Sequence, residues 1–246
     1  AKGYHLVLTA RRTERLEAIA QELAQAHGIQ TKVISADLAS PYASHDIAKA
    51  IEEAGIKLEV LVNNAGYGVA GKLTAVDWQV HQDFLQVMVN AVVELSYRLL
   101  PNLRQRPQSA IINVASLAGL VPGSAGHTLY GASKAFLIRF SESLLLENEQ
   151  FGVQVQALCP GFTYSEFHDV VGTREQVNRM PDYMWMKSDD VVRESLAKAS
   201  KLGSLSVVVP GRVNRIIARL MRWLPQSTTQ NMVRKRSQDF RATEPK

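Results

Sequence analysis

The chain has 246 residues, 46% of them hydrophobic and 21% charged, which is typical of one globular domain with a sizeable core and excludes a disordered chain. Its single cysteine, Cys159, excludes an internal disulfide framework and a zinc site built from several thiolates, and favours a reducing compartment. The net charge of +5 comes from the tail, because residues 211–246 hold nine Lys or Arg and two Asp or Glu.

Short apolar segments alternate with helical patterns along most of the chain. Strands are predicted at residues 5–9, 31–36, 58–62, 110–115, 153–158 and 205–209. Helices are predicted from the N-cap Thr13 to Gly28, from Ser40-Pro41 onward, over residues 77–103 and over residues 130–150. The alternation predicts right-handed βαβ units, and hence a single-domain, Rossmann-like, doubly wound parallel sheet with helices on both faces.

The stretch from Asn113 to Lys134 carries the strongest chemical signal. Ser116 follows a buried strand, and the spacing of four places Tyr130 and Lys134 on one face of the next helix. A phenol has a pKa of roughly 10, and an adjacent lysine cation is expected to lower it towards working pH. The three side chains therefore predict proton transfer on a C–O group. The alternative is a core tyrosine with a surface lysine one turn further on.

Four polar or turn residues follow four of the predicted strands, namely Asp37, Asn63, Ser116 and Pro160. Ligands of doubly wound sheets bind beyond the carboxyl ends of the strands. Because the carboxyl ends of parallel strands meet at one edge, these residues are expected to lie around a single ligand site. Cys159 lies between the end of the predicted strand 153–158 and Pro160, and it is interpreted as an inert buried thiol.

Several motifs follow one another in the order and at the spacings of a known family. They are Asp37-Leu38, Asn63-Asn64-Ala65-Gly66, Asn90, Ser116, Tyr130-x-x-x-Lys134 and Pro160-Gly161. From Gly3 to Gly211 the sequence resembles the short-chain dehydrogenase/reductase superfamily. The resemblance implies a Rossmann-like sheet that binds NAD(H) or NADP(H) and an enzyme that moves a hydride between nicotinamide and a carbonyl or alcohol.

The resemblance also implies roles for individual residues. Tyr130 would be the general acid or base, and Lys134 would lower its pKa and hold the nicotinamide ribose. Ser116 would polarise the substrate oxygen, and Asn90 would anchor a water relay. The chemistry agrees, because hydride transfer at carbon creates charge on oxygen, which preorganised hydroxyl groups stabilise.

Further residues are implied as contacts of the cofactor. They are Asp37, Leu38, Asn63, Asn64, Ala65, Gly66, Pro160, Gly161, Phe162, Thr163 and Ser165, beside Tyr130 and Lys134. Asp37 would receive the adenine amino group, although an acid at a strand end also has a structural explanation. Arg11 and Arg12 follow the first strand where an acid would select NAD(H), so NADP(H) is favoured over NAD(H). Alternatively, these two arginines only begin a solvated helix.

One feature of the family is absent from the sequence. The pattern Thr-Gly-x-x-x-Gly-x-Gly would follow the family's first strand, whereas this sequence begins in what resembles the end of the first helix. A doubly wound sheet without that central strand would leave its neighbours roughly 9 to 10 Å apart. We therefore expect the sequence to be an N-terminally incomplete piece of a longer protein, with no assignable pyrophosphate site and weak cofactor binding.

Two C-terminal segments lie outside these motifs. Residues 162–190 are expected to cover the substrate, and the aromatic and methionine side chains there favour a lipophilic ketone or alcohol, unless they only complete the core. His168 has no partner for a metal site, and no metal site is predicted.

Residues 212–224 form a basic amphipathic pattern that fits a helix docked on its own domain or a second subunit, a membrane-surface helix, or a nucleic-acid contact. No nucleic-acid motif accompanies it.

The predicted organisation is therefore a catalytic domain over residues 1–211, a lid over 162–190 within it, and a basic extension over 212–246. The predicted function is that of an NADP(H)-dependent oxidoreductase acting on a lipophilic carbonyl or alcohol. Two alternatives remain: a non-catalytic NADP-binding sensor or scaffold, and an isomerase or dehydratase with similar tyrosine chemistry. The family resemblance implies a homodimer or homotetramer. Without an apolar run near 18 residues or a signal peptide, the protein is expected to be cytoplasmic, with peripheral membrane contact through 212–224 left open.

Overall fold

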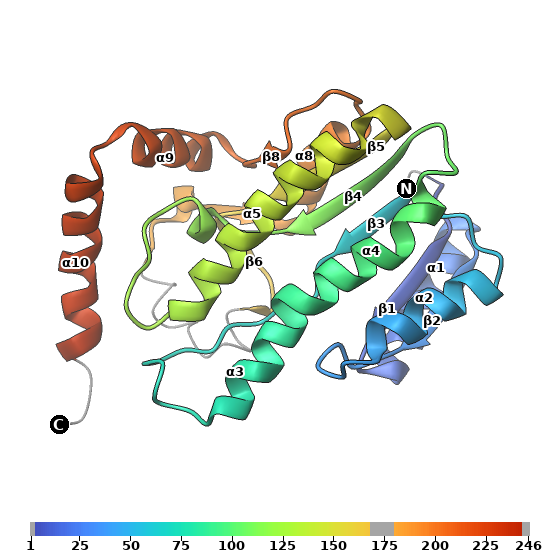
Figure 1. Ribbon diagram of the computed structural model, residues 1–246, viewed down its shortest axis with the longest axis horizontal. Helices are drawn as coiled ribbons and strands as arrows, with labels where there is room; N and C mark the ends of the chain where they lie inside the picture. The colour runs from blue at the N-terminus through green and yellow to red at the C-terminus, as the bar shows by residue number, and fades with distance from the viewer. Residues whose placement is uncertain (1–2, 168–179, 243–246) are drawn as a thin grey trace.

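The computed structural model describes residues 3–167 and 180–242, with side chains as far as residue 235 (Figure 1). The strands are β1 (Leu6–Ala10), β2 (Thr31–Ser35), β3 (Val60–Asn63), β4 (Ser109–Val114), β5 (Val153–Leu158), β6 (Phe162–Tyr164), β7 (Trp185–Lys187) and β8 (Val207–Val208). The α-helices are α1 (Thr13–His27), α2 (Ala43–Glu53), α3 (Trp78–Leu85), α4 (Ala91–Leu103), α5 (Thr128–Asn148), α8 (Ser188–Ala199), α9 (Arg212–Trp223) and α10 (Gln226–Ala242).

Every strand pair in the described residues is parallel, as the βαβ alternation predicts. The main sheet has the strand order β3-β4-β5-β8, with the apolar strands β4 and β5 buried at its centre. Alternate residues of β5 pack against helices on opposite sides: Ala157 lies in a cluster with Leu137 of α5, and Leu158 in one with Val191 of α8. The predicted Rossmann-like parallel sheet with helices on both faces is therefore confirmed.

The hydrogen-bonded sheet is interrupted between β1 and β3. Strands β1 and β2 form a separate parallel pair, and no ladder within the described residues joins β1 to β3. Helices α2 and α4 still connect the two parts, because Ile47 and Leu95 share a cluster with Val7 and Ile34. Val62 of β3 is 52% exposed, which is unusual for a strand covered on both faces. That a further central strand belongs at this break stays a prediction.

Several predicted boundaries shift. Helix α1 begins at Thr13 itself, and Arg12 occupies the N-cap position, because the Thr13 hydroxyl hydrogen-bonds the Ser35 hydroxyl at 2.6 Å instead of a helix amide. Gly28 ends the helix with φ of 64°, the left-handed conformation that glycine adopts without strain. Helix α2 begins at Ala43 because a turn occupies the residues after Ser40.

The long helix predicted over residues 77–103 is divided into three parts. Helix α3 continues into the π-helical turn η1 (Gln86–Asn90) and then into α4. A π turn inserts a residue into the helical repeat and often marks a functional position. Asn90 is the last residue of this turn.

The tail leaves the sheet as two helices at one end of the molecule, opposite the end that holds β1 and β2 (Figure 1). Helix α9 packs on its own domain through Asn214, which is buried, and α10 runs down at the edge of the molecule. Within the described residues no helix has the length and hydrophobicity needed to cross a membrane. The division into a catalytic domain, a lid and a tail stays a prediction.

Candidate functional site

A glycine brings the loop after β4 against helix α5. Ser116 begins a short 3-10 turn, η2 (Leu117–Gly119), and its hydroxyl accepts a hydrogen bond from the Ala118 amide at 3.1 Å. A Cβ on Gly119 would lie 2.7 Å from the carbonyl carbon of Lys134 and 2.8 Å from its oxygen. Only a residue without a side chain permits this approach, so the loop holds Ser116 beside the first turns of α5.

The Ser116 hydroxyl lies beside the Tyr130 phenol. Burial raises the pKa of that phenol, and the neighbouring Ser116 hydroxyl partly opposes that rise. The expectation that Lys134 lowers this pKa is therefore not met, because burial dominates and no effect of Lys134 on Tyr130 is resolved. The predicted pairing of a serine hydroxyl with a phenol is present in the structure.

Lys134 is 6% exposed and lies beside Tyr130, with Nζ 5.7 Å from the centre of the phenol ring. Its ammonium donates a hydrogen bond of 2.6 Å to the Val114 carbonyl at the end of β4. Burial lowers the pKa of Lys134 to about 8. The lysine is therefore a buried cation near neutral pH, held between the strand end and the tyrosine.

A buried polar network fixes the strand ends beneath these groups. The Asn63 side chain of β3 donates to the side-chain oxygen Oδ1 of Asn113 at 2.8 Å and to the Ser96 hydroxyl at 3.3 Å, and the Asn113 side chain donates to the Ser141 hydroxyl at 2.9 Å. These bonds tie β3 and β4 to α4 and α5, and such satisfied networks make a core rigid. The Asn63 side-chain amide therefore ties strand ends together, and a contact of Asn63 with the cofactor stays a prediction.

The residues after Asn63 are accessible. Asn64, Ala65 and Gly66 are exposed, and a Cβ on Gly66 would lie 3.8 Å from the Lys134 ammonium. A backbone of small residues beside a buried cation fits the close approach of a ribose or phosphate-bearing ligand. Of these three predicted cofactor contacts, Gly66 thus lies next to Lys134.

The Pro160-Gly161 turn is joined to the Ser116 loop by one backbone bond. The Leu117 amide donates to the Pro160 carbonyl at 2.8 Å. The Thr163 hydroxyl donates to the Gly161 carbonyl at 3.1 Å, and the Ser165 hydroxyl donates to the Thr163 carbonyl at 3.5 Å. The turn therefore lies at the same sheet edge as Ser116, as predicted from the strand ends.

The two arginines predicted to bind a 2′-phosphate are exposed beyond β1. Arg12 lies 3.5 Å from a carboxylate oxygen of Glu166, and Arg15 donates two hydrogen bonds to the same carboxylate, at 2.6 and 3.1 Å. The sequence has no acidic residue next to Arg11 and Arg12. In the structure the carboxylate of Glu166, which follows β6, lies beside Arg12. The sequence offered no signal for this ion pair, because its partners are about 150 residues apart.

The remaining predicted residues have local roles. Asp37 accepts a hydrogen bond from the Ala39 amide at 3.0 Å, and Leu38 packs against the core cluster under α2 and α4. The bond to Ala39 is the structural explanation for an acid at the end of a strand. Asn90 is exposed and donates to the Gln86 side chain at 2.9 Å.

The segment after β5 brings one aromatic ring, that of Phe167, against Tyr130, and its other aromatic rings pack on one another. The ring of Phe167 lies 5.7 Å from the Tyr130 ring, and Trp185 packs between Phe162 at 5.5 Å and Tyr164 at 4.7 Å. Strands β6 and β7 pair here, within the segment 162–190 that is predicted to cover the substrate. Residues 168–179, including His168, lie outside the described residues.

Comparison with known proteins agrees with this geometry. Residues 1–176 match the short chain dehydrogenase family. The chain belongs to that family. It is 29% identical over 224 residues to an uncharacterized oxidoreductase of Myxococcus xanthus, covering 91% of this chain and 84% of the relative.

Two solved structures of the family resemble the whole chain. The first is described as giving insights into 7beta-hydroxysteroid dehydrogenase stereoselectivity (TM-score 0.80, 25% identity, 95% of this chain and 87% of that one). The second is a short-chain dehydrogenase from Sphingobium yanoikuyae in complex with NADPH (TM-score 0.76, 28% identity, 92% of this chain and 88% of that one). The chain is thus an oxidoreductase of the short-chain dehydrogenase family, whose members act on alcohol and carbonyl groups.

Three further observations concern groups and surfaces outside the Ser116, Tyr130 and Lys134 site. Burial raises the pKa of the Cys159 thiol to about 12, so this side chain stays an uncharged thiol at neutral pH, as the sequence predicted. The described residues contain no group of three His, Cys, Asp or Glu side chains placed to hold a metal ion. A cleft of about 540 Å³ between α2 and α4 is lined by none of the predicted site residues.

Proposed function

We propose that the protein is an NADP(H)-dependent carbonyl reductase or alcohol dehydrogenase for lipophilic substrates. The observation that supports this most directly is the position of the Ser116 and Tyr130 hydroxyls beside the buried Lys134 ammonium. A protein that only binds a cofactor does not need hydroxyls arranged around a buried cation. The same pair could serve an isomerase or dehydratase, but the family assignment favours oxidoreduction.

In the proposed reaction a bound nicotinamide supplies or accepts the hydride. Ser116 donates a hydrogen bond to the substrate oxygen, and Tyr130 gives that oxygen a proton during reduction or removes one during oxidation. Lys134 provides a fixed positive charge while the negative charge develops on the oxygen. Asn90, at the end of the π turn, would hold a water that returns the proton to the site. Phe167 shields Tyr130 from solvent and supports an apolar substrate.

Arg11 and Arg12 are the proposed contacts of the 2′-phosphate of NADP(H). Their exposure beyond β1 supports this, as does the NADPH complex of the relative from Sphingobium yanoikuyae. Guanidinium groups bind phosphate oxygens in a bidentate manner, whereas a 2′-hydroxyl gains little from them. The exposed pair of Glu166 with Arg12 and Arg15 would have to loosen when the phosphate binds.

Replacing Arg11 and Arg12 by alanine together is expected to raise the KM for NADPH by roughly 10- to 100-fold, because charged hydrogen bonds are lost. The KM for NADH should change less than threefold. Steady-state kinetics with both cofactors and a panel of apolar ketones measures this. Arg193→Ala removes an exposed arginine of α8 and is the control. An equal rise for both cofactors would contradict the NADP(H) assignment.

We also propose a contact between the outward face of α9 and an anionic membrane surface. This face carries the apolar stripe Ile216, Leu220 and Trp223, all exposed, with Trp223 at 85%. Exposed arginines Arg212, Arg219 and Arg222 flank the stripe. A second copy using the same face would place like charges together, whereas anionic lipid would neutralise them.

Changing Ile216, Leu220 and Trp223 together to serine is expected to abolish flotation with phosphatidylglycerol vesicles while the fold is kept. The face is exposed, so its loss should not affect the core. Vesicles of phosphatidylcholine are the control for charge. Equal partitioning of both proteins would refute the membrane contact.

Oligomerisation through α4 and α5, where Tyr97 and Leu146 are exposed, is proposed separately and would be measured by light scattering.

A further inference from the structure

A small cavity lies beside Tyr130 at the N-terminal end of α5. Its volume is about 10 Å³, which is the space of one water molecule or one hydroxyl group. Tyr130 and His81 line it, together with the apolar residues Val69, Leu73, Phe84 and Leu129. One wall thus belongs to the proposed acid, and most of the others are hydrocarbon.

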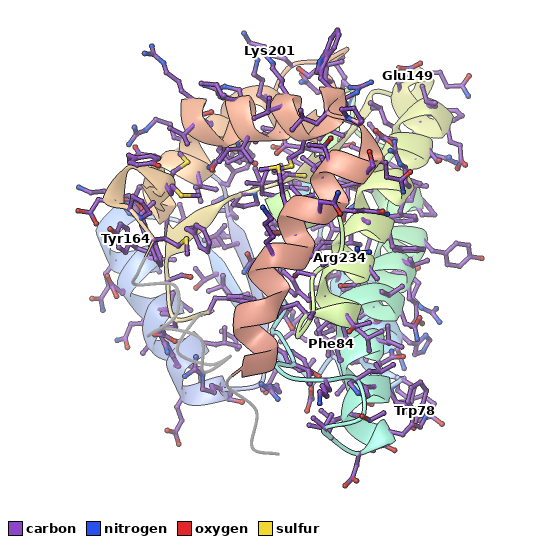
Figure 2. The ribbon with its side chains drawn as sticks, turned by 90° about the vertical axis from the view of Figure 1, so that its left-hand side faces the viewer. Trp78, Phe84, Glu149, Tyr164, Lys201 and Arg234 are labelled. Carbon is purple, nitrogen blue, oxygen red and sulfur yellow. The ribbon has the colours of Figure 1, made fainter. Side chains whose placement is uncertain are left out.

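His81 and Thr128 carry the polar side chains in this lining that the proposed reaction does not use. His81 belongs to α3, where Trp78 is exposed and Phe84 is fully buried. Figure 2 labels these last two residues. His81 is 4% exposed, and its Nε2 lies 2.7 Å from the Leu73 carbonyl oxygen. Its Nδ1 is buried and has no hydrogen-bond partner among the described residues.

The bond to Leu73 determines what Nδ1 can bind. A carbonyl oxygen only accepts hydrogen bonds, so Nε2 carries the proton. In the neutral imidazole the other nitrogen is then an acceptor. A buried acceptor without a donor is unfavourable, and native proteins generally supply a partner for such an atom. The partner required here is an O–H or N–H group of the size of the cavity.

We propose that His81 and this cavity form a polar subsite that accepts a hydroxyl group of the substrate. The proposal rests on the proposed function and refines its substrate class to an apolar ketone or alcohol that carries a second hydroxyl. The carbonyl is bound by Ser116 and Tyr130, and the distal hydroxyl donates its hydrogen bond to His81 Nδ1. A binding site of this kind discriminates strongly, because a substrate without the hydroxyl leaves the acceptor unpaired.

The proposed binding role of His81 Nδ1 can be tested separately from the structural bond of Nε2 to Leu73. His81→Gln places an amide N–H where Nε2 lies, so it keeps the bond to Leu73 but removes the acceptor. His81→Asn places a carbonyl oxygen near the position of Nδ1, so it keeps an acceptor but loses the bond to Leu73. The two variants therefore divide the functions of the two ring nitrogens between them.

The test uses methyl ketones of increasing chain length, each compared with the same ketone bearing a terminal hydroxyl, and NADPH as reductant. For the chain length that spans the site, the unmodified protein should prefer the hydroxylated ketone by roughly tenfold or more in kcat/KM. His81→Gln should lose this preference and keep its activity on the plain ketone. His81→Asn should retain part of the preference despite a lower midpoint of thermal unfolding.

Two results would overturn the proposal: no preference in the unmodified protein at any chain length, or an undiminished preference in His81→Gln. If no ketone is reduced at all, the proposed function is refuted. The subsite is then tested by measuring how ketone binding shifts the thermal unfolding midpoint. The hydroxylated ketones should then raise the thermal unfolding midpoint of the unmodified protein more than the plain ketones do, and this difference should vanish in His81→Gln. An equal shift with both series would refute the subsite independently of turnover.

Discussion

Tyr130→Phe is expected to lower kcat for ketone reduction roughly 10²- to 10⁴-fold, because the variant keeps the ring but has no proton to transfer. The ring contacts with Phe167 and the Lys134 ammonium do not involve the hydroxyl, so the fold and the cofactor KM should change little. Stopped-flow and steady-state measurements of NADPH oxidation give kcat and the cofactor KM. Thermal unfolding in parallel tests whether the fold is kept.

The matched control is Tyr164→Phe. Tyr164 is exposed and stacks on Trp185, and it lies in the same segment of the chain as Phe167. Removing its hydroxyl should leave kcat within about twofold of the unmodified protein, since surface changes have small effects. Unchanged turnover in Tyr130→Phe would contradict its role as acid or base, whereas an equal loss in both variants would indicate a general disturbance of the segment.

The sequence predicted the hydroxyl pair because two local rules specify it. A buried strand ends before Ser116, and a spacing of four places Tyr130 and Lys134 on one helix face. Neither rule needs knowledge of distant residues. The electrostatics could not be predicted in the same way, since the pKa of Tyr130 depends on the depth of burial, and the direction of the Lys134 ammonium depends on the Val114 carbonyl.

Features that depend on tertiary packing were not predictable. The pairing of Arg15 with Glu166 joins residues 151 positions apart in the sequence, and the polar network joins two strands to two helices. The π turn that ends at Asn90 interrupts a helix whose sequence pattern is continuous. His81 was not singled out, because its significance lies in a bond to Leu73 that leaves the second nitrogen unpaired.

The same limit applies to Gly119, which the sequence placed only in a loop of small residues. Its φ is not in the positive region, so alanine could adopt its backbone conformation. The constraint is steric: a Cβ would lie within 2.8 Å of three backbone atoms of Lys134 and Ala135, where no side chain can rotate away. Either the loop or the helix must therefore move, and this movement separates Ser116 from Tyr130.

Gly119→Ala is accordingly expected to destabilise the fold by about 1 to 3 kcal/mol, as overpacking of a close contact does. A displacement of about 1 Å at Ser116 should also lower kcat/KM on the order of 10²-fold. Urea unfolding and steady-state kinetics at a temperature where the variant is folded measure the two effects separately.

Gly123→Ala provides the control, because a Cβ there would meet nothing within 4 Å and its φ is likewise not in the positive region. It changes the same loop by one methyl group and should leave both stability and kcat/KM nearly unchanged. If Gly119→Ala lost stability but kept full activity, the close contact would hold the loop without positioning Ser116. If both variants kept full activity and stability, the contact of the loop with α5 would not determine the geometry of the site.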